Sequence, residues 1–464
     1  GPPGPPGKLS PEEWAKIRDT INRLAQEFRP ELQRLGADIK SVQRVLKKID
    51  QRLAALEREV RRVRTTGEVI PIVKSTDSTK GTPSDINAKG ISSQPIAVGY
   101  DTTLRIVHRA GKNAVAGLEL NALRTVTGAP FIGTSAVEGI APEVRLWKAY
   151  VSVWKKNRYL LTMGDFDLRL TKFTLSEPDP DFYTRIRRDD DRAYTLRGVR
   201  LHYRLGKIRL AAALARSRPN FDNARLGSWS LTNFLTALGG APTEPVVMAA
   251  RATMPFKALR RGTLGATWLR LRDRQTDKNA DIWGADIELS LTKRLTLRGD
   301  YAEADTSEFP SGSDTDNAAY DVALGWAAGG PLYLGVGYRR VEQNYYAPGD
   351  WGLGAAASWR RAVDYKGYYA TASYRLASNL SLGATYADYD QITGPNKFKR
   401  TLIRVNWRPT KKCTVLAGLE QNKIENAVTW TDSYYTLRLR YSFNPTTSLD
   451  AVYQYVDQEY DPTN

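Results

Sequence analysis

The chain has 464 residues, and its 68 Lys and Arg outnumber its 50 Asp and Glu to give a formal net charge of +18. This length fits two or three ordinary domains or one very large closed sheet, and the charge favours an anionic partner. A single cysteine, Cys413, excludes an intrachain disulfide and a cysteine metal cage. No run of about twenty apolar residues is present, which excludes a transmembrane helix.

The first nine residues are interpreted as a linker. Residues 1–7 read GPPGPPG, two Gly-Pro-Pro triplets that suit either a stiff polyproline segment or the tail of a longer collagen triple helix. We favour the linker because two triplets alone do not hold a triple helix. Neither a Met nor a signal peptide begins the chain, so we expect export to be encoded upstream.

A short helix is predicted from Ser10 onward. Ser10 is a suitable N-cap, Pro11 fits the first helical position, and Glu13 completes a capping box. The apolar residues of this helix recur at spacings of three and four: Trp14, Ile17, Ile21, Leu24 and Phe28. Pro30 interrupts the pattern, so the sequence predicts a kink near residues 29–30.

A second helix with a heptad pattern is predicted from about residue 31 to residue 64, roughly 50 Å long at 1.5 Å per residue. Its a and d positions form one apolar seam: Leu32, Leu35, Ile39, Val42, Leu46, Ile49, Leu53, Leu56, Val60 and Val63. Because β-branched residues are not segregated between a and d, the seam fits a trimer at least as well as a dimer. Residues 10–65 are therefore interpreted as a coiled-coil stalk. The alternative is a helix that packs on its own barrel.

The hydrophobic period changes at residues 65–67 from heptads to strict alternation. From there on, segments of about ten residues alternate apolar and polar side chains, as Leu295, Leu297 and Tyr301 do with Thr296 and Arg298. This pattern predicts an all-β transmembrane antiparallel barrel of about 16–18 strands for residues 66–464. A soluble β-sandwich is the alternative, but it would not place many arginines on one face of its strands.

The connectors between these segments alternate between short turns and long polar loops. The short ones are residues 205–207, 291–294, 328–331, 376–379, 408–411 and 443–446. Long connectors such as residues 306–317 and 344–360 are rich in Asp and Gly. Short turns at one rim and long loops at the other, with Tyr and Trp near the strand ends, are typical of an outer-membrane barrel.

Many arginines fall on the polar face of the predicted strands. The pore-lining candidates are Arg200, Arg204, Arg298, Arg375, Arg400, Arg404, Arg438 and Arg440. In a wide barrel this face lines an aqueous channel, where a charged side chain stays hydrated. We therefore expect an electropositive pore that prefers anions to cations of equal size.

Two long connectors are candidates for a loop that folds into the channel. The first, residues 169–192, carries opposed charges that could set a transverse field, and a solvated extracellular loop is its alternative. Its constriction candidates are Arg185, Arg187, Arg188, Asp189, Asp190 and Asp191. The second, residues 219–242, is apolar enough to form a short helix against the wall. Its apolar residues are Trp229, Leu231, Phe234, Leu235 and Leu238.

The sequence contains no catalytic constellation, so we expect no enzyme. His108 and His202 have no serine motif around them and are interpreted as ordinary strand residues. The three aspartates at 189–191 lack metal-ligand spacing, so neither a metal nor a cofactor is expected. Cys413 is interpreted as an unreactive residue at the start of a strand. The basic residues are spread along the chain and not gathered in one stripe, so nucleic acid is not an expected partner.

Two segments resemble a known family. Residues 8–60, which begin KLSPEEWAKIRDTINRLAQEF, and residues 336–352, VGYRRVEQNYYAPGDWG, are similar to the OmpM-like outer-membrane stalk porins. Members of that family carry a signal peptide, an S-layer-homology domain, a coiled coil and a porin barrel. The resemblance implies a homotrimer in the lipid of the cell outer membrane, with a periplasmic stalk directed toward peptidoglycan or a secondary cell-wall polymer.

The chain departs from that family at both ends. The wall-binding domain is absent from these residues, so tethering needs an N-terminal part that precedes them. The chain ends in DPTN and not on an aromatic closing strand, so we expect a last strand beyond it. The leading hypothesis is a trimeric porin that passes small hydrophilic solutes with anion preference. The alternatives are a purely structural tether with an occluded barrel and a secreted fibrous adhesin.

Overall fold

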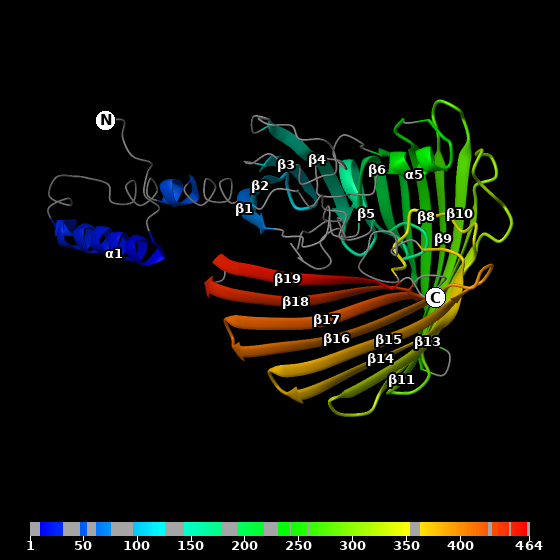
Figure 1. The fold of residues 1–464 in the computed structure, drawn as a ribbon. Coiled ribbons are helices and arrows are strands. Elements are labelled where there is room, and N and C mark those ends of the chain that lie inside the picture. Colours follow the sequence, from blue (N-terminus) through cyan, green and yellow to red (C-terminus); the bar gives the residue numbers. More distant parts are fainter. Residues whose placement is uncertain are drawn as a thin grey trace. The chain divides into compact units, whose positions relative to one another are not determined.

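The computed structural model describes residues 10–30, 47–52, 62–75, 96–125, 143–177, 193–217, 231–241, 243–257, 260–352, 362–425, 429–444 and 447–461. The chain divides into two compact units, Gly1–Arg64 and Thr65–Asn464. Helix predominates in the described part of the first unit and strand in that of the second (Figure 1).

The first helix, α1 (Pro11–Glu27), has the predicted start. The Ser10 side chain accepts a hydrogen bond from the Glu13 N–H at 3.2 Å, and the Glu13 carboxylate accepts one from the Ser10 N–H at 2.6 Å. These two bonds satisfy N–H groups that the helix itself leaves without partners. The helix ends at Glu27 with Phe28 as its C-cap, next to the predicted kink. All its side chains are exposed, including the apolar stripe that begins with Trp14.

The end of the predicted stalk requires a correction. Residues 47–52 are helical, and Ile49 is exposed there. Val63, predicted as the last seam position, is instead the first residue of strand β1 (Val63–Ser75). This segment is rich in β-branched residues, which favour an extended backbone over a helix. The other seam positions lie outside the described residues: Leu32, Leu35, Ile39, Val42, Leu46, Leu53, Leu56 and Val60.

The first half of the β region runs to the middle of the chain. After β1, its strands are β2 (Ile96–Arg109), β3 (Ala114–Thr125), β4 (Glu143–Lys155), β5 (Tyr159–Leu168), β6 (Tyr194–Leu205), β7 (Ile208–Ser217), β8 (Val246–Phe256), β9 (Arg261–Arg272) and β10 (Asn279–Ser290). One short helix, α5 (Leu231–Ala237), lies between β7 and β8.

The second half continues in the same manner to the end of the described residues. Its strands are β11 (Leu295–Asp305), β12 (Ala318–Ala327), β13 (Leu332–Val341), β14 (Tyr365–Ala377), β15 (Leu380–Gln391), β16 (Lys397–Thr410), β17 (Cys413–Glu425), β18 (Thr429–Asn444) and β19 (Thr447–Asp461). Cys413 is thus the first residue of β17, where it is half-buried.

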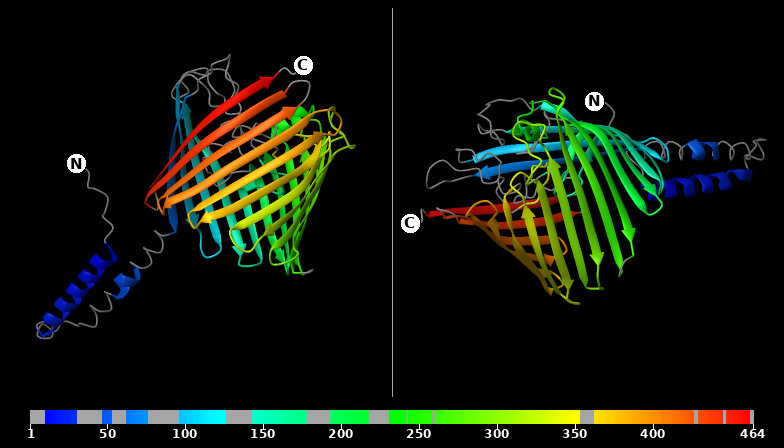
Figure 2. Two further views of the ribbon diagram at one scale, coloured as in Figure 1. Left: turned by 60° about the horizontal axis from the view of Figure 1, so that its bottom comes forward. Right: turned by 90° about the vertical axis from the view of Figure 1, so that its right-hand side faces the viewer.

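All these strands belong to one sheet that curves into a barrel (Figure 2). From β2 to β19 each strand pairs antiparallel with the next along the chain, and β1 pairs with β2. The described residues form nineteen strands, more than the expected 16–18. Gly67 and Pro71 interrupt the alternation in β1, and both residues are poor strand formers, so the sequence pattern does not mark this strand.

The connectors sort onto the two rims as predicted, because successive antiparallel strands end at opposite rims. The predicted short connectors lie after β6, β10, β12, β14, β16 and β18, and we call their end of the barrel the short-turn rim. The connectors after β5, β7, β9, β11 and β13 lie at the opposite end, the long-loop rim.

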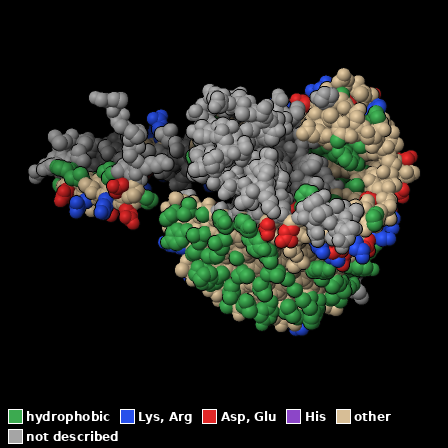
Figure 3. Space-filling view, viewed as in Figure 1, with side chains coloured by type: hydrophobic (Ala, Val, Ile, Leu, Met, Phe, Trp, Pro, Cys, Tyr) green, Lys and Arg blue, Asp and Glu red, His purple; other side chains and the backbone are tan. Residues whose placement is uncertain are grey.

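Side chains alternate between an outer and an inner face of the sheet. On β12, Val322, Leu324 and Trp326 are exposed on the outer face, whereas Asp321 is only 2% exposed on the inner face. The cross-strand register continues this alternation into the neighbouring strands. Hydrophobic side chains cover the outer surface over β14 to β18 (Figure 3). An apolar outer band of this kind is what a lipid-facing barrel presents.

A buried core lies inside the barrel, at the ends of the strands near the long-loop rim. On the inner face of β11 and β12 it contains small residues, Ala302, Ala304 and Ala319. These leave room for aromatic residues that come from the long connectors, such as Phe173 and Tyr345. The core therefore forms between the wall and inward-folded loops.

Candidate functional site: a constriction inside the barrel

The first inward segment follows β5. Residues 169–177 turn into the barrel, where Phe173 and Leu175 are completely buried. The turn is held by the Thr171 and Thr174 hydroxyl groups, which lie 2.9 Å apart, and by the Leu170 N–H, which donates to Leu175 O at 2.8 Å. This is the beginning of the first predicted constriction loop. The charged candidates Arg185, Arg187, Arg188, Asp189, Asp190 and Asp191 lie outside the described residues.

The connector after β13, residues 342–352, packs against this segment. The Tyr345 hydroxyl donates to Phe173 O at 2.5 Å, and the Asp350 N–H donates to Lys172 O at 2.7 Å. Gly349 allows the close approach, since a Cβ there would lie 2.3 Å from Lys172 O. The sequence predicted only a long polar loop here. Its aromatic residues, such as Tyr345 and Trp351, were the available signal for an inward-folded segment.

The third inward segment is helix α5. The second predicted loop does form a short helix, in which Leu231, Phe234 and Leu235 are buried. Phe234 stacks on Tyr346 of the β13–β14 connector with ring centroids 4.6 Å apart. Leu238, just beyond the helix, is also buried, whereas Trp229 lies outside the described residues. Three connectors therefore contribute to one packed core inside the barrel.

The chain after α5 is held by a buried carboxylate. The Asp273 side chain, in the connector between β9 and β10, accepts the Ala241 N–H at 2.7 Å and the Gln275 N–H at 2.9 Å. Burial alone would raise the pKa of Asp273, but these bonds and those from Thr276 outweigh it and hold this pKa below its ordinary value. Asp273 therefore connects the α5 segment to the wall as a carboxylate.

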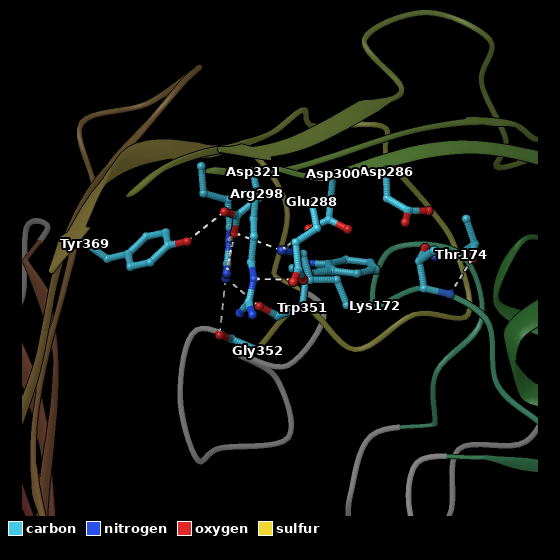
Figure 4. A network of polar contacts seen from close by, with 12 residues as sticks. Lys172, Thr174, Asp286, Glu288, Arg298, Asp300, Asp321, Trp351, Gly352 and Tyr369 are labelled. Atoms are coloured by element: carbon cyan, nitrogen blue, oxygen red, sulfur yellow. Dashed lines mark hydrogen bonds and ion pairs between the residues drawn. The ribbon is translucent and has the colours of Figure 1, made fainter. Parts of the chain in front are cut away.

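An acidic strip on the inner face of β10 to β12 faces the first inward segment. The strip consists of Asp286, Glu288, Asp300 and Asp321. The Lys172 Nζ lies 2.8 Å from an Asp300 oxygen and 3.2 Å from an Asp321 oxygen (Figure 4). One inward-folded lysine thus bridges carboxylates on two neighbouring strands.

Arg339 on β13 holds the second inward segment to the same carboxylate. Its Nε donates to Asp321 Oδ2 at 2.6 Å, and its Nη1 donates to Trp351 O at 2.5 Å. The Tyr369 hydroxyl donates to Asp321 Oδ1 at 2.7 Å, so both oxygens of the Asp321 carboxylate have partners (Figure 4). The Asp321 side chain is 2% exposed and the Arg339 side chain 13% exposed. A buried pair of this kind is strongly sensitive to the loss of either partner.

A further ion pair crosses the wall from β8 to β10. Arg251 donates to both Asp286 oxygens, at 2.6 and 2.9 Å, and so spans the intervening strand β9. Gly265 on β9 makes this possible, because a Cβ there would lie 2.3 Å from Asp286 Oδ2. Neither Lys172, Arg251 nor Arg339 was among the predicted site residues. Their role depends on the spatial order of strands and loops, which the alternation pattern does not contain.

Five of the predicted pore-lining arginines contact backbone carbonyls or carboxylates near the middle of the wall or toward the short turns. Arg200 donates to Asp167 O at 2.6 Å, and Arg204 donates to Gly206 O at 3.2 Å. Each of the other three pairs with a carboxylate: Arg298 with Glu288 at 3.2 Å, Arg400 with Glu420 at 2.9 Å, and Arg438 with Asp450.

The remaining three predicted arginines share the strand face of these residues. Arg404 on β16 lies opposite Gly383 of β15, and Arg440 on β18 lies opposite Asp450 of β19. Arg375 is near the end of β14. Within the described part of the chain, Arg375 and Arg440 are exposed and have no ion-pair partner within 4.0 Å. These two cations are therefore the least compensated of the predicted set.

The described residues contain no group of three His, Cys, Asp or Glu arranged to hold a metal ion. His108 and His202 are exposed strand residues. Among the described helices, none is long and apolar enough to cross a membrane. The site therefore offers charged and aromatic side chains that can bind and orient solutes.

The comparisons with known proteins concern the fold. No protein-family model matches the chain, and neither does any curated protein sequence. The solved structure of OccK9 (OpdG) from Pseudomonas aeruginosa is similar, with 14% identity, a TM-score of 0.52, and coverage of 85% of this chain and 98% of that one. OpdQ from the same organism has 12% identity and a TM-score of 0.49, covering 84% and 96%. OccAB3 from Acinetobacter baumannii has 12% identity and a TM-score of 0.49, covering 78% and 93%.

The similarity to OccK9 supports one conclusion about architecture. The similar region covers nearly all of OccK9. The second unit of this chain therefore shares the antiparallel β-barrel fold of OccK9.

Proposed function

We propose that this protein is a trimeric outer-membrane porin that passes small hydrophilic solutes with a preference for anions. In this proposal the stalk lies in the periplasm and links the outer membrane toward the cell wall. The observation that carries the proposal is the division of the sheet into an exposed apolar outer face and an inner face that bears arginines. Such a sheet is stable when lipid covers the outside and water reaches the inside.

The constriction supplies the size limit of the channel. Lys172 and Arg339 hold two inward connectors against Asp321. These connectors fill part of the barrel near the long-loop rim. Solutes then pass beside the packed loops and along the arginine-bearing wall of β14 to β18. Exposed cations such as Arg375 and Arg440 lower the electrostatic energy of an anion more than that of a cation in this part of the channel.

The trimer and the stalk are supported by α1. The apolar side chains of α1 are exposed along one stripe in the single chain, and a coiled-coil partner would cover them. The OmpM-like resemblance adds the direction of the stalk toward peptidoglycan or a secondary cell-wall polymer, through an N-terminal domain that precedes these residues. Further copies of the chain and outer-membrane lipid are the other partners.

The proposal is tested in planar bilayers with a salt gradient. The reversal potential of the wild type should indicate anion preference, and replacing Arg375 and Arg440 with Gln should shift it toward cations. A matched variant with Lys397 and Lys423 replaced by Gln, on the outer face, should retain the wild-type reversal potential. A protein that inserts without conducting would refute the pore and favour the alternative of a structural tether with an occluded barrel. The buried aromatic residues of the inward loops are the observation in favour of that alternative.

The oligomeric state is tested by mass measurement in detergent. We expect the mass of three chains for the wild type. Replacing Ile17 and Ile21 with Asp places two charges in the exposed stripe of α1 and should reduce the trimer fraction. A variant in which the exposed polar residues Arg18 and Asp19 are exchanged for Ser is the control. A wild type that is monomeric at all concentrations would contradict the trimer.

A further inference from the structure

The turns of the short-turn rim carry positive charge only. They comprise residues 110–113, 156–158, 206–207, 257–260, 291–294, 328–331, 378–379, 411–412 and 445–446, and none of these is Asp or Glu. The basic residues among them are Lys112, Lys156, Arg158, Lys207, Lys257, Arg260, Lys293, Arg294, Lys411 and Lys412. We call these ten residues the basic ring. They lie in six of the nine turns, and the turns at residues 328–331, 378–379 and 445–446 carry no charge, so the rim as a whole has an excess of positive charge.

Within the described residues, no carboxylate compensates the charge of the basic ring. All ten side chains are exposed, and among the residues that the structure describes none has a carboxylate within 4.0 Å. Arg294 donates to a backbone carbonyl, Ala328 O, at 3.4 Å, which leaves its charge unbalanced. Like charges on one rim repel one another and destabilise the folded barrel. A partner that brings negative charge to this rim removes that penalty.

The long-loop rim is different. Several of its basic residues pair with carboxylates: Arg272 with Asp277, Arg340 with Glu342 at 3.2 Å, and Lys399 with Glu425 at 2.9 Å. Its connectors also contain many acidic residues, such as those of residues 306–317. The excess of positive charge is therefore a property of one rim and not of strand ends in general.

Aromatic side chains mark the level of the membrane at the short-turn rim, mostly on strands next to its uncharged turns. Exposed aromatic residues lie on the outer face two to four positions before the turns: Trp326, Tyr374, Trp407, Tyr441 and Phe443. Aromatic belts of this kind sit at the level of the lipid headgroups. At about 3.3 Å per residue, the turns lie within about 13 Å of these rings along the strands. This places the basic ring at the phosphate groups of the adjacent leaflet.

We infer that the basic ring binds the phosphate headgroups of anionic phospholipid in the leaflet at the short-turn rim. Each Lys or Arg near such a surface gains from the negative surface potential, which decays within a Debye length. The ring therefore gives the barrel a preference for anionic lipid on one side only, and this preference orients it in the membrane. The inference rests on the proposed membrane location and is independent of whether the channel conducts.

The test compares two variants with the same change in charge. In the turn variant Lys207, Lys293, Lys411 and Lys412 are replaced by Gln. In the control variant Lys366, Lys397, Lys399 and Lys423, on the strands near the long-loop rim, are replaced by Gln. The full-length protein is exchanged into nanodiscs of phosphatidylcholine with a small fraction of phosphatidylglycerol. The phosphatidylglycerol retained after detergent extraction is then counted by native mass spectrometry at low and at high salt.

We expect the wild type and the control variant to retain phosphatidylglycerol over phosphatidylcholine. The turn variant should bind phosphatidylglycerol at least about tenfold more weakly, and high salt should remove the difference. Equal retention by the turn variant and the wild type would overturn the inference. So would a turn variant that keeps its phosphatidylglycerol but loses binding to soluble polyphosphate, because the partner would then be an anionic polymer.

Heat-dependent mobility on gels checks folding of each variant. The conductance of the same samples is also measured. A sample that retains phosphatidylglycerol but does not conduct would refute the proposed pore and leave the lipid inference intact.

Discussion

Lys172 and Asp321 form an ion pair at 3.2 Å although they are far apart in sequence, and the partners come from an inward-folded connector and from the barrel wall. Arg339 approaches the same carboxylate from the next strand at 2.6 Å and also holds Trp351 O of a second connector. One buried carboxylate thus fixes two inward segments. The width of the proposed channel depends on this single group.

Replacing Asp321 with Asn should release both connectors. The substitution leaves Lys172 and Arg339 without their shared partner, and breaking a buried pair costs about 3–5 kcal/mol of folding free energy. We expect a lower midpoint of urea unfolding and a larger, noisier single-channel conductance. Asp300→Asn is the control, since Lys172 keeps Asp321 and the more exposed Asp300 contributes about 1 kcal/mol or less. Equal conductance of wild type and Asp321→Asn would contradict this role.

Gly349→Ala should separate the two inward connectors from each other. The added Cβ would lie 2.3 Å from Lys172 O, a backbone atom, so one connector has to move. Strain of this kind costs about 1–3 kcal/mol. Gly383→Ala provides the comparison on the inner face of β15, because its nearest neighbouring atom is 3.9 Å away. The midpoint temperature of thermal unfolding should fall for Gly349→Ala and stay nearly unchanged for Gly383→Ala. A larger fall for Gly383→Ala than for Gly349→Ala would refute the packing described here.

The α5 segment should loosen at low pH through Asp273. Hydrogen bonds hold the pKa of Asp273 below its ordinary value, so its stabilising contribution is complete above the unfolded-state pKa and is lost as the pH falls through the folded-state pKa. Asp273→Asn should therefore destabilise the barrel by about 1.5–3 kcal/mol at neutral pH. The difference from wild type should shrink as the pH falls below the ordinary pKa of an aspartate, about 3.9, and through the lower folded-state pKa. Urea unfolding of both proteins at several pH values measures this difference in unfolding free energy. Asp314→Asn, an exposed neighbour-loop carboxylate, is the control, and a difference that is constant with pH would count against this interpretation.

Ser10→Ala should fray the start of α1. Removing the capping hydroxyl leaves the Glu13 N–H without its partner and costs about 1 kcal/mol of helix stability. Amide hydrogen exchange in the full-length protein should become faster at Glu13 and Trp14. Thr20→Ala, in the middle of the exposed helix, should not accelerate exchange at these residues. Unchanged exchange after Ser10→Ala would mean that the capping box contributes nothing in solution.

The sequence by itself determined the class of fold. Alternation such as that of Leu295, Leu297 and Tyr301 requires only that one face be apolar, and this local property can be read without knowing strand partners. The capping box at Ser10 and Glu13 and the short helix at residues 231–237 were predictable for the same reason, since their signals lie within one turn or one loop. The order of short and long connectors then followed from the chain alone.

The tertiary structure alone decided the site. Lys172 meets Asp321 only because residues 169–177 fold inward, and Arg251 meets Asp286 only because glycine occupies the strand between them. Such contacts depend on the register of strands and on the paths of loops, which have no local signature in the sequence. Strand pairing in the tertiary structure also determines where β1 begins and ends. The pairing of a strand with its neighbours stabilises residues such as Gly67 and Pro71 in a conformation that their own propensities disfavour.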